Sequence, residues 1–239
     1  MRTDAQIKLL ELTRHQDTLA IDELAQEMRI PQARLMGSLE NFRRNGYICF
    51  GRGRLAVNSK QRILIAEKLI HCGRDPDKIA RCLEWQEFES FASHSLTENG
   101  FQAVRHFVFK TRVGRREIDV LAWNDNFLFA IDCKHWTKGF QPSRMKTAVL
   151  AHIERTSKLA ERPDILRRIG LRNPDRRSIM PVFVTLGEPR LRSIDGVPIV
   201  AVSKLLSFLY GISPIDENFL RIRVRHLDTS RLLAEPPKS

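Results

Sequence analysis

Residues 117–123 read EIDVLAW and residues 127–136 read FLFAIDCKHW, and the fold prediction starts from these two runs. Both have the length and the apolar content of strands, and a third such run covers residues 101–110. The residues between the first two runs, Asn124-Asp125-Asn126, are typical of a hairpin turn. We therefore expect consecutive strands of one sheet.

Carboxylates lie inside these apolar strands. Because side chains alternate between the two faces of a strand, Asp132 and Lys134 are expected on one face. Asp119 is flanked by Ile118 and Val120, so alternation predicts that its side chain points away from both. If the two strands pair through the turn, Asp119 and Asp132 converge at one end of the sheet.

A helix is predicted over residues 85–99, just before the strands. Its apolar stripe consists of Trp85, Phe88, Ala92 and Leu96. Glu89 falls inside that stripe, where a carboxylate must be paired, protonated or bound to a metal. Glu87 and Glu98 fall outside it and are expected to be solvated. We expect the helix to bring Glu89 to the same side of the sheet as the two aspartates.

Such a cluster of carboxylates is typical of a divalent-cation site. Neighbouring carboxylates repel one another and do not all ionise without a cation. Oxygen ligands suit Mg²⁺ or Mn²⁺, which commonly bind one or two carboxylates together with waters and phosphate oxygens. Lys134 would then neutralise a phosphate or orient an attacking water.

In order, Glu89, Asp119 and Asp132-Cys133-Lys134 resemble the signature of the PD-(D/E)xK nucleases, which have the restriction-endonuclease-like fold. The likeness covers residues 85–136, and is strongest to archaeal Holliday-junction resolvases and type IV restriction endonucleases. It implies that Asp119 and Asp132 hold Mg²⁺, which Mn²⁺ can replace. Glu89 would bind through water or hold a second ion, and Lys134 would position the nucleophilic water. Two departures are Ile118 where the family name has proline, and Asp132 where glutamate is commoner.

The first 59 residues show a second pattern. Apolar residues predict a helix over 4–14 and a helix pair, with Ile21, Leu24, Ala25 and Met28 on the first member and Leu35, Leu39 and Phe42 on the second. Two short strands, 47–50 and 55–57, flank Gly51-Arg52-Gly53-Arg54, whose glycines suit a tight hairpin. This order resembles the winged helix-turn-helix family.

The winged-helix resemblance implies contacts with DNA through the second helix of the pair and through the hairpin. The implied residues are Arg34, Ser38, Arg43, Arg52 and Arg54. Further DNA contacts are expected from basic residues around the nuclease-like motif, namely Arg112, Arg115, Arg116 and Arg144. Winged helices also serve as protein-binding modules, and this alternative stays open.

The chain is therefore divided into a winged helix-turn-helix domain at residues 1–59, a helical connector at 60–84 and a nuclease-like domain at 85–239. In the last part, further helices are predicted over 143–159, 163–169 and 203–210, and strands over 179–186 and 197–202. The fold class is α/β, with a mixed sheet flanked by helices.

Composition favours a polyanionic partner, either nucleic acid or an anionic membrane face. Lys and Arg number 40 against 28 Asp and Glu, which gives a net charge of +12 over 239 residues. No apolar run reaches the ~18 residues of a membrane span, and the N-terminus lacks a signal-peptide core, so a cytoplasmic protein without a membrane partner is expected. The four cysteines form no CxxC pair, which argues against a zinc ribbon.

The sequence thus predicts a Mg²⁺-dependent endodeoxyribonuclease, targeted by a winged helix, in DNA repair, recombination or restriction. The main alternative is a catalytically inactive DNA-binding regulator or repair scaffold that retains the nuclease fold. The sequence carries no signal about a homodimer, which nucleases of this fold often form.

Overall fold

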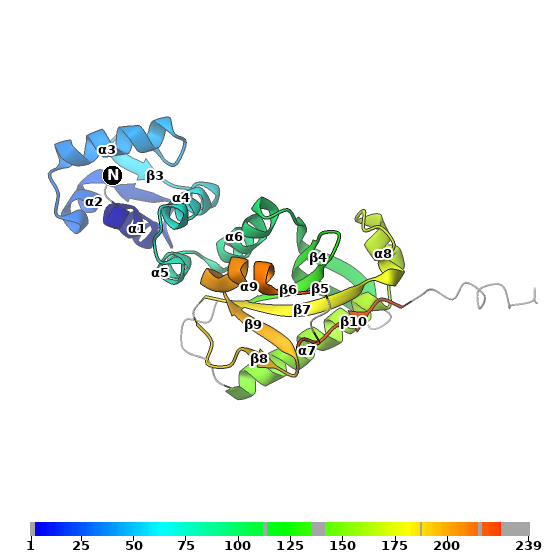
Figure 1. Cartoon of the computed structure of the whole chain (residues 1–239). Coiled ribbons are helices and arrows are strands. Elements are labelled where there is room, and N and C mark those ends of the chain that lie inside the picture. The colour runs from blue at the N-terminus through cyan, green and yellow to red at the C-terminus, as the bar shows by residue number, and fades with distance from the viewer. Residues whose placement is uncertain (1–2, 112–113, 135–141, 187, 215–216, 226–239) are drawn as a thin grey trace, which may run out of the picture.

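The computed structural model describes residues 3–111, 114–134, 142–186, 188–214 and 217–225. It is an elongated molecule in which a small N-terminal part and a larger part with a central sheet are joined by two helices (Figure 1). Among the described residues, no helix is long and apolar enough to cross a membrane.

The N-terminal part consists of three helices and a small sheet. Its elements are α1 (Thr3–Leu12), β1 (Thr18–Ala20), α2 (Ile21–Met28), α3 (Gln32–Arg44), β2 (Cys49–Gly51) and β3 (Arg54–Ala56). The strands form an antiparallel sheet in the order β1-β3-β2. The predicted helices and hairpin are present, and β1 is an addition that the sequence did not indicate because it is only three residues long.

The hairpin between β2 and β3 has a two-residue turn. Arg52 and Gly53 have φ angles of 51° and 74°, and Gly51 pairs with Arg54 across the ladder. Two successive positive φ angles match the twist of a two-residue hairpin, which explains the glycine here. The turn leaves Arg52 and Arg54 exposed, and Arg54 is held by a hydrogen bond to Thr18 Oγ1 of 3.0 Å.

The two joining helices are α4 (Ser59–His71) and α5 (Pro76–Arg81). A reciprocal capping box between Asn58 and Gln61 begins α4. Its buried face, which includes Ile65 and Leu69, belongs to a single hydrophobic cluster that runs from α1 through α4 to one face of the large sheet. The connector is therefore packed on both sides.

The larger part has a mixed sheet. Its elements are α6 (Trp85–Glu98), β4 (Gln102–Thr111), β5 (Gly114–Trp123), β6 (Leu128–Lys134), α7 (Pro142–Ala160), α8 (Pro163–Arg168), a 3₁₀ turn (Pro174–Arg176), β7 (Ser178–Thr185), β8 (Ser193–Ile194), β9 (Val197–Ala201), a second 3₁₀ turn (Val202–Lys204), α9 (Leu205–Gly211) and β10 (Ile222–Arg223). The strand order is β4-β5-β6-β7-β9-β8, and β10 pairs with the start of β7. Strands β4, β5 and β6 are antiparallel, whereas β6, β7 and β9 are parallel.

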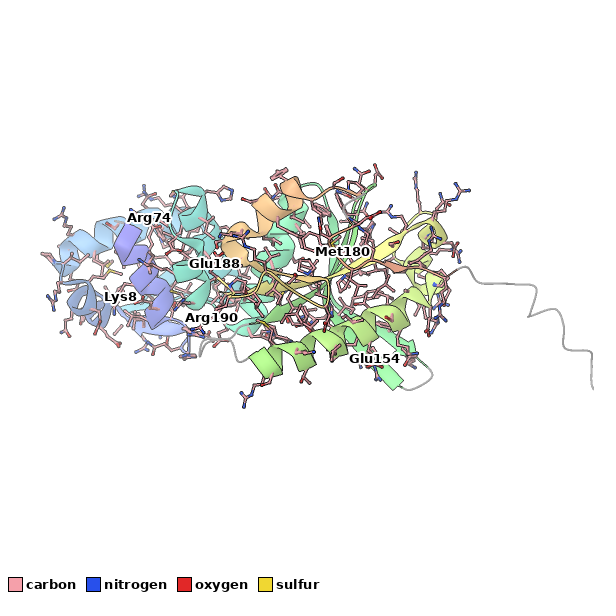
Figure 2. The ribbon with its side chains drawn as sticks, turned by 60° about the horizontal axis from the view of Figure 1, so that its bottom comes forward. Lys8, Arg74, Glu154, Met180, Glu188 and Arg190 are labelled. Carbon is pink, nitrogen blue, oxygen red and sulfur yellow. The ribbon has the colours of Figure 1, made fainter. Side chains whose placement is uncertain are left out.

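Helices cover both faces of this sheet. Helices α6 and α9 lie on one face, and α7 runs along the other (Figure 1). Figure 2, in which Glu154 marks α7 and Met180 marks β7, shows the long helix lying across the sheet. Along β6, Ile131 and Cys133 pack into the cluster that includes α6, whereas Ala130 packs into the cluster that includes the end of α7. Alternation along β6 is therefore as predicted.

Two expectations about α6 are wrong. Trp85 is 47% exposed, because it occupies the first position of the helix rather than its packed middle. Glu87 is buried, not solvated, and its carboxylate binds the buried guanidinium of Arg62 at 2.9 Å. The charge that neutralises Glu87 comes from α4, a helix 25 residues earlier in the chain, so helical spacing within α6 gave no sign of it.

Candidate active site

The site lies where β5 and β6 stop pairing. Their antiparallel register ends at Val120 opposite Ile131, and the next residues along the two strands are Asp119 and Asp132. Beyond this point the backbone N–H of Cys133 donates to Asp119 Oδ2 at 2.8 Å instead of to a strand neighbour. The end of the ladder thus fixes the carboxylate of Asp119 against the backbone of β6.

Simple alternation fails at Asp119. Ile118 and Val120, expected on one face, pack into different hydrophobic clusters on the two sides of the sheet. His106, the β4 residue between those that pair with Val120 and Ile118, has a φ of 49°. A residue whose backbone lies in the left-handed region distorts a strand locally. Asp119 therefore lies at the change of face and can approach groups from both sides.

Asp132 lies on the α7 side of β6 and is 2% exposed. Lys134, two residues on along the same face, forms an ion pair with its Oδ1, as alternation led us to expect. Arg155 of α7 forms a second ion pair, with Oδ2. Two cations therefore neutralise this buried carboxylate. An isolated charge would be very unfavourable there.

His152, one turn before Arg155 on α7, completes this side of the site. Its Nε2 lies 2.9 Å from the carbonyl oxygen of Ala130, and its Nδ1 lies 3.5 Å from Arg155 Nη2 and 4.0 Å from Asp132 Oδ2. Burial lowers the pKa of His152 to about 4, so the ring is neutral at pH 7. With the proton on Nε2 donated to the carbonyl, Nδ1 accepts from the Arg155 guanidinium.

Glu89 reaches the site from α6, on the opposite face of the sheet from Asp132. This corrects the expectation that both lie on one side. Glu89 is 0% exposed, and neither carboxylate oxygen has a hydrogen-bond partner among the described residues. His106 Nε2 lies 3.5 Å from Oε2. Burial, followed by the charge of Asp119, raises the pKa of Glu89 to about 7.

The three carboxylates influence one another. Burial and then the charge of Asp132 raise the pKa of Asp119 to about 6, although the Cys133 N–H lowers it. The pKa of the buried Cys133 thiol is raised by burial and by Asp119, Glu89 and Asp132. Cys133 adjoins Asp119 through its N–H and Asp132 along the chain, and Lys134 pairs with Asp132, so these residues lie together at the end of β6. Glu89 approaches from the α6 side, where the charge of Asp119 acts on it.

The donor set fits a divalent cation bound by two carboxylates. No group of three or more His, Cys, Asp or Glu side chains in the described part of the chain could share one metal ion. Asp119 and Asp132 at the end of the ladder supply two oxygen donors, which is sufficient for Mg²⁺ when waters and phosphate oxygens complete the shell. The unpartnered oxygens of Glu89 and the pKa of Asp119, raised chiefly by burial, show that the described side chains do not fully compensate these carboxylates.

The residues predicted to contact DNA differ in their exposure and in whether they already form ion pairs. Arg34, Arg52, Arg54, Arg115 and Arg144 are exposed, whereas Ser38 and Arg116 are half-buried. Arg43 is exposed but forms a two-pronged ion pair with Glu40, and Arg116 lies 3.8 Å from Glu154. Arg112 lies outside the described residues.

Three polar residues near the site were missed in the sequence. Arg155 and His152 lie on α7, whose mixture of charged and apolar residues resembles any surface helix. His106 lies on β4 in an apolar run. The spacing of His152 and Arg155, i and i+3, shows that they share a helix face, but only the packing of α7 on β6 shows what that face contacts.

Comparison with known proteins supports a nuclease. Residues 80–156, which contain Glu89, Asp119, Asp132 and Lys134, match the family described as restriction endonuclease (Mrr_cat). A relative from Archaeoglobus fulgidus, described as an uncharacterized protein, is 28% identical over 131 residues, which are 54% of this chain and 92% of its own length.

Two solved structures show some similarity. The protein of unknown function AF1548 has a TM-score of 0.35 and 17% identity, over 56% of this chain and 73% of its own. The protein VC1899 from Vibrio cholerae has a TM-score of 0.39 and 13% identity, over 87% of this chain and 49% of its own.

Proposed function

We propose that this protein is a divalent-metal-dependent endonuclease that hydrolyses phosphodiester bonds in DNA, with Mg²⁺ as the ion and Mn²⁺ able to replace it. The observation that carries the proposal is the placement of Asp119 and Asp132 at the point where β5 and β6 stop pairing, with Lys134 on the second aspartate. The family match over residues 80–156 supports the same class of activity.

Each residue has a role that its position supports. Asp119 and Asp132 would hold the ion, and Glu89 would bind a water of the ion's shell or a second ion. The bound ion supplies Lewis-acid stabilisation of the phosphate and lowers the pKa of water. Lys134, whose side chain is 26% exposed, can leave Asp132 to orient the attacking water or to neutralise the phosphate. The buried surroundings strengthen these electrostatic contacts.

The N-terminal part would act as a winged helix-turn-helix that binds DNA. Its helices α2 and α3 and its hairpin follow that order, and α3 offers Arg34 on an exposed face. The hairpin offers Arg52 and Arg54. In this arrangement α3 would lie in the major groove and the hairpin would contact phosphates.

Nicking of supercoiled plasmid, and cleavage of duplex, forked and four-way DNA, test the activity with Mg²⁺, Mn²⁺ or Ca²⁺. We expect cleavage with Mg²⁺ and Mn²⁺, and a loss of at least a hundredfold in Lys134→Ala. Lys204→Ala removes an exposed lysine that pairs with Glu188 and should cleave normally. Equal cleavage by Lys134→Ala and the unaltered protein would remove the catalytic assignment.

A second candidate is a DNA-binding regulator or scaffold that does not cut. The observation in its favour is that two cationic side chains, Lys134 and Arg155, both pair with the carboxylate of Asp132 and so balance its charge within the protein. Salt-sensitive DNA binding without cleavage under any divalent ion would favour this function. A DNA affinity of Lys134→Ala equal to that of the unaltered protein is compatible with both candidates. Metal-dependent cleavage by the unaltered protein separates them, because only the nuclease cuts.

A further inference from the structure

Arg155 of α7 is half-buried and reaches the carboxylate of Asp132 on β6 from the sheet-facing side of its helix. Arg155 Nη2 lies between Asp132 Oδ2 and the neutral Nδ1 of His152. The guanidinium therefore approaches the carboxylate through one nitrogen rather than through the two-pronged arrangement that arginine favours. Its Nε–H is buried and has no hydrogen-bond partner among the described residues.

We propose that Arg155 is a positioning residue that stands in for the metal ion at Asp132 and is released towards the substrate phosphate when the ion binds. This inference rests on the proposed function. Asp132 is 2% exposed, so its buried charge needs cationic partners, and Arg155 supplies one on Oδ2 while Lys134 pairs with Oδ1. A cation on the same oxygen would displace the guanidinium by charge repulsion.

His152 orients the Arg155 guanidinium for this exchange with the metal ion. Its ring is fixed by the 2.9 Å contact between Nε2 and the Ala130 carbonyl oxygen, so Nδ1 has one direction in which to accept. Apart from the 3.5 Å contact to Nδ1, the guanidinium is held among the described residues by one ion pair, with Asp132. The Arg155 side chain is 28% exposed, so it is not enclosed by the packing of α7. Release would free donors in the planar fork that binds phosphate oxygens in pairs.

Mn²⁺ binding tests the exchange without any need for cleavage. In full-length Arg155→Gln, calorimetry or electron paramagnetic resonance with Mn²⁺ alone should show binding roughly tenfold tighter, because one charged hydrogen-bonded competitor is gone. Lys158→Gln is the control, since it removes another cation of α7, a lysine whose side chain is 34% exposed and pairs with Glu161 just after the helix. Asp132→Asn added to Arg155→Gln should abolish the gain.

DNA affinity provides the second readout. In Ca²⁺, which occupies such sites without being expected to support cleavage, Arg155→Gln should bind duplex DNA more weakly than Arg155→Lys or the unaltered protein. Mn²⁺ affinity of Arg155→Gln equal to or below that of the unaltered protein would overturn the proposal. If the unaltered protein cleaves DNA but Arg155→Gln shows no gain in Mn²⁺ affinity, only the role of Arg155 fails. If no Mn²⁺ binds to either protein, both proposals fail.

Discussion

Arg62 of α4 and Glu87 of α6 form an ion pair that is almost completely buried, with 3% and 4% of their side chains exposed. The same guanidinium donates to the carbonyl oxygens of Leu10 and Cys82 and to Thr13 Oγ1. One side chain therefore links the N-terminal helix, the connector and the helix that bears Glu89.

Breaking this pair should destabilise the protein strongly. In Glu87→Ala the Arg62 guanidinium loses its carboxylate in a buried place, and we expect a loss of ~3–5 kcal/mol in the free energy of unfolding. Urea denaturation measures it, with Gln86→Ala, at an exposed position of the same helix, as the control. Since the bonds of Arg62 reach α1, the N-terminal part should unfold in the same transition. A change below 1 kcal/mol would contradict this prediction.

Stability should fall as pH rises in the absence of divalent metal. The pKa of Glu89 is raised to about 7 in the fold from 4.5, so the folded protein binds this proton more tightly than the unfolded chain does. The resulting stabilisation is complete below pH 4.5 and is lost as the pH rises through 7. Glu89→Gln keeps a neutral side chain at all pH values and should flatten this dependence by on the order of 2 kcal/mol between pH 5 and 8. Thermal denaturation at several pH values measures it. Glu98→Gln, which alters an exposed carboxylate of α6, should keep the slope of the unaltered protein.

Activity and stability should diverge at Asp119. Asp119→Asn retains an oxygen that can accept the hydrogen bond of the Cys133 N–H. It removes the carboxylate charge, which is unfavourable in the fold because the pKa of Asp119 is raised to about 6. At pH 8 without metal we expect a higher melting temperature, by a few degrees, together with the loss of cleavage. Calorimetry and the plasmid assay measure the two effects. A lower melting temperature would show that the Asp119 charge supports the fold instead.

Charge reversal at the hairpin should weaken DNA binding. Arg52→Glu with Arg54→Glu removes two proposed phosphate contacts, so the slope of log K against log salt should fall by roughly 1.8. Arg176→Glu with Arg223→Glu makes the same change in net charge beside β10, at the end of the large sheet away from the N-terminal part (Figure 1). Equal slopes for the two double variants would indicate that net charge alone matters, and that the N-terminal part serves another partner.

The sequence predicted well the features that depend on neighbours along one element. Alternation placed Asp132 and Lys134 on one face, and paired glycines around Arg52 predicted the hairpin. Helical spacing likewise found the buried position of Glu89.

Features that depend on a partner from a distant element were missed or wrong. The burial of Glu87 depends on Arg62, and the contacts of Asp132 depend on Arg155, 23 residues later. The change of face at Asp119 accompanies a left-handed residue on another strand, His106. Local periodicity cannot show which elements pack together, so it cannot locate these charges' partners.

The unbroken apolar cluster from α1 to the large sheet has a mechanical consequence. If the N-terminal part binds DNA as proposed, a flexible linker would let the nuclease-like part reach many phosphates, whereas packing through α4 keeps the two parts at one distance and one angle. Cleavage by the proposed nuclease should then fall at a constant distance along the DNA from the segment that the hairpin contacts.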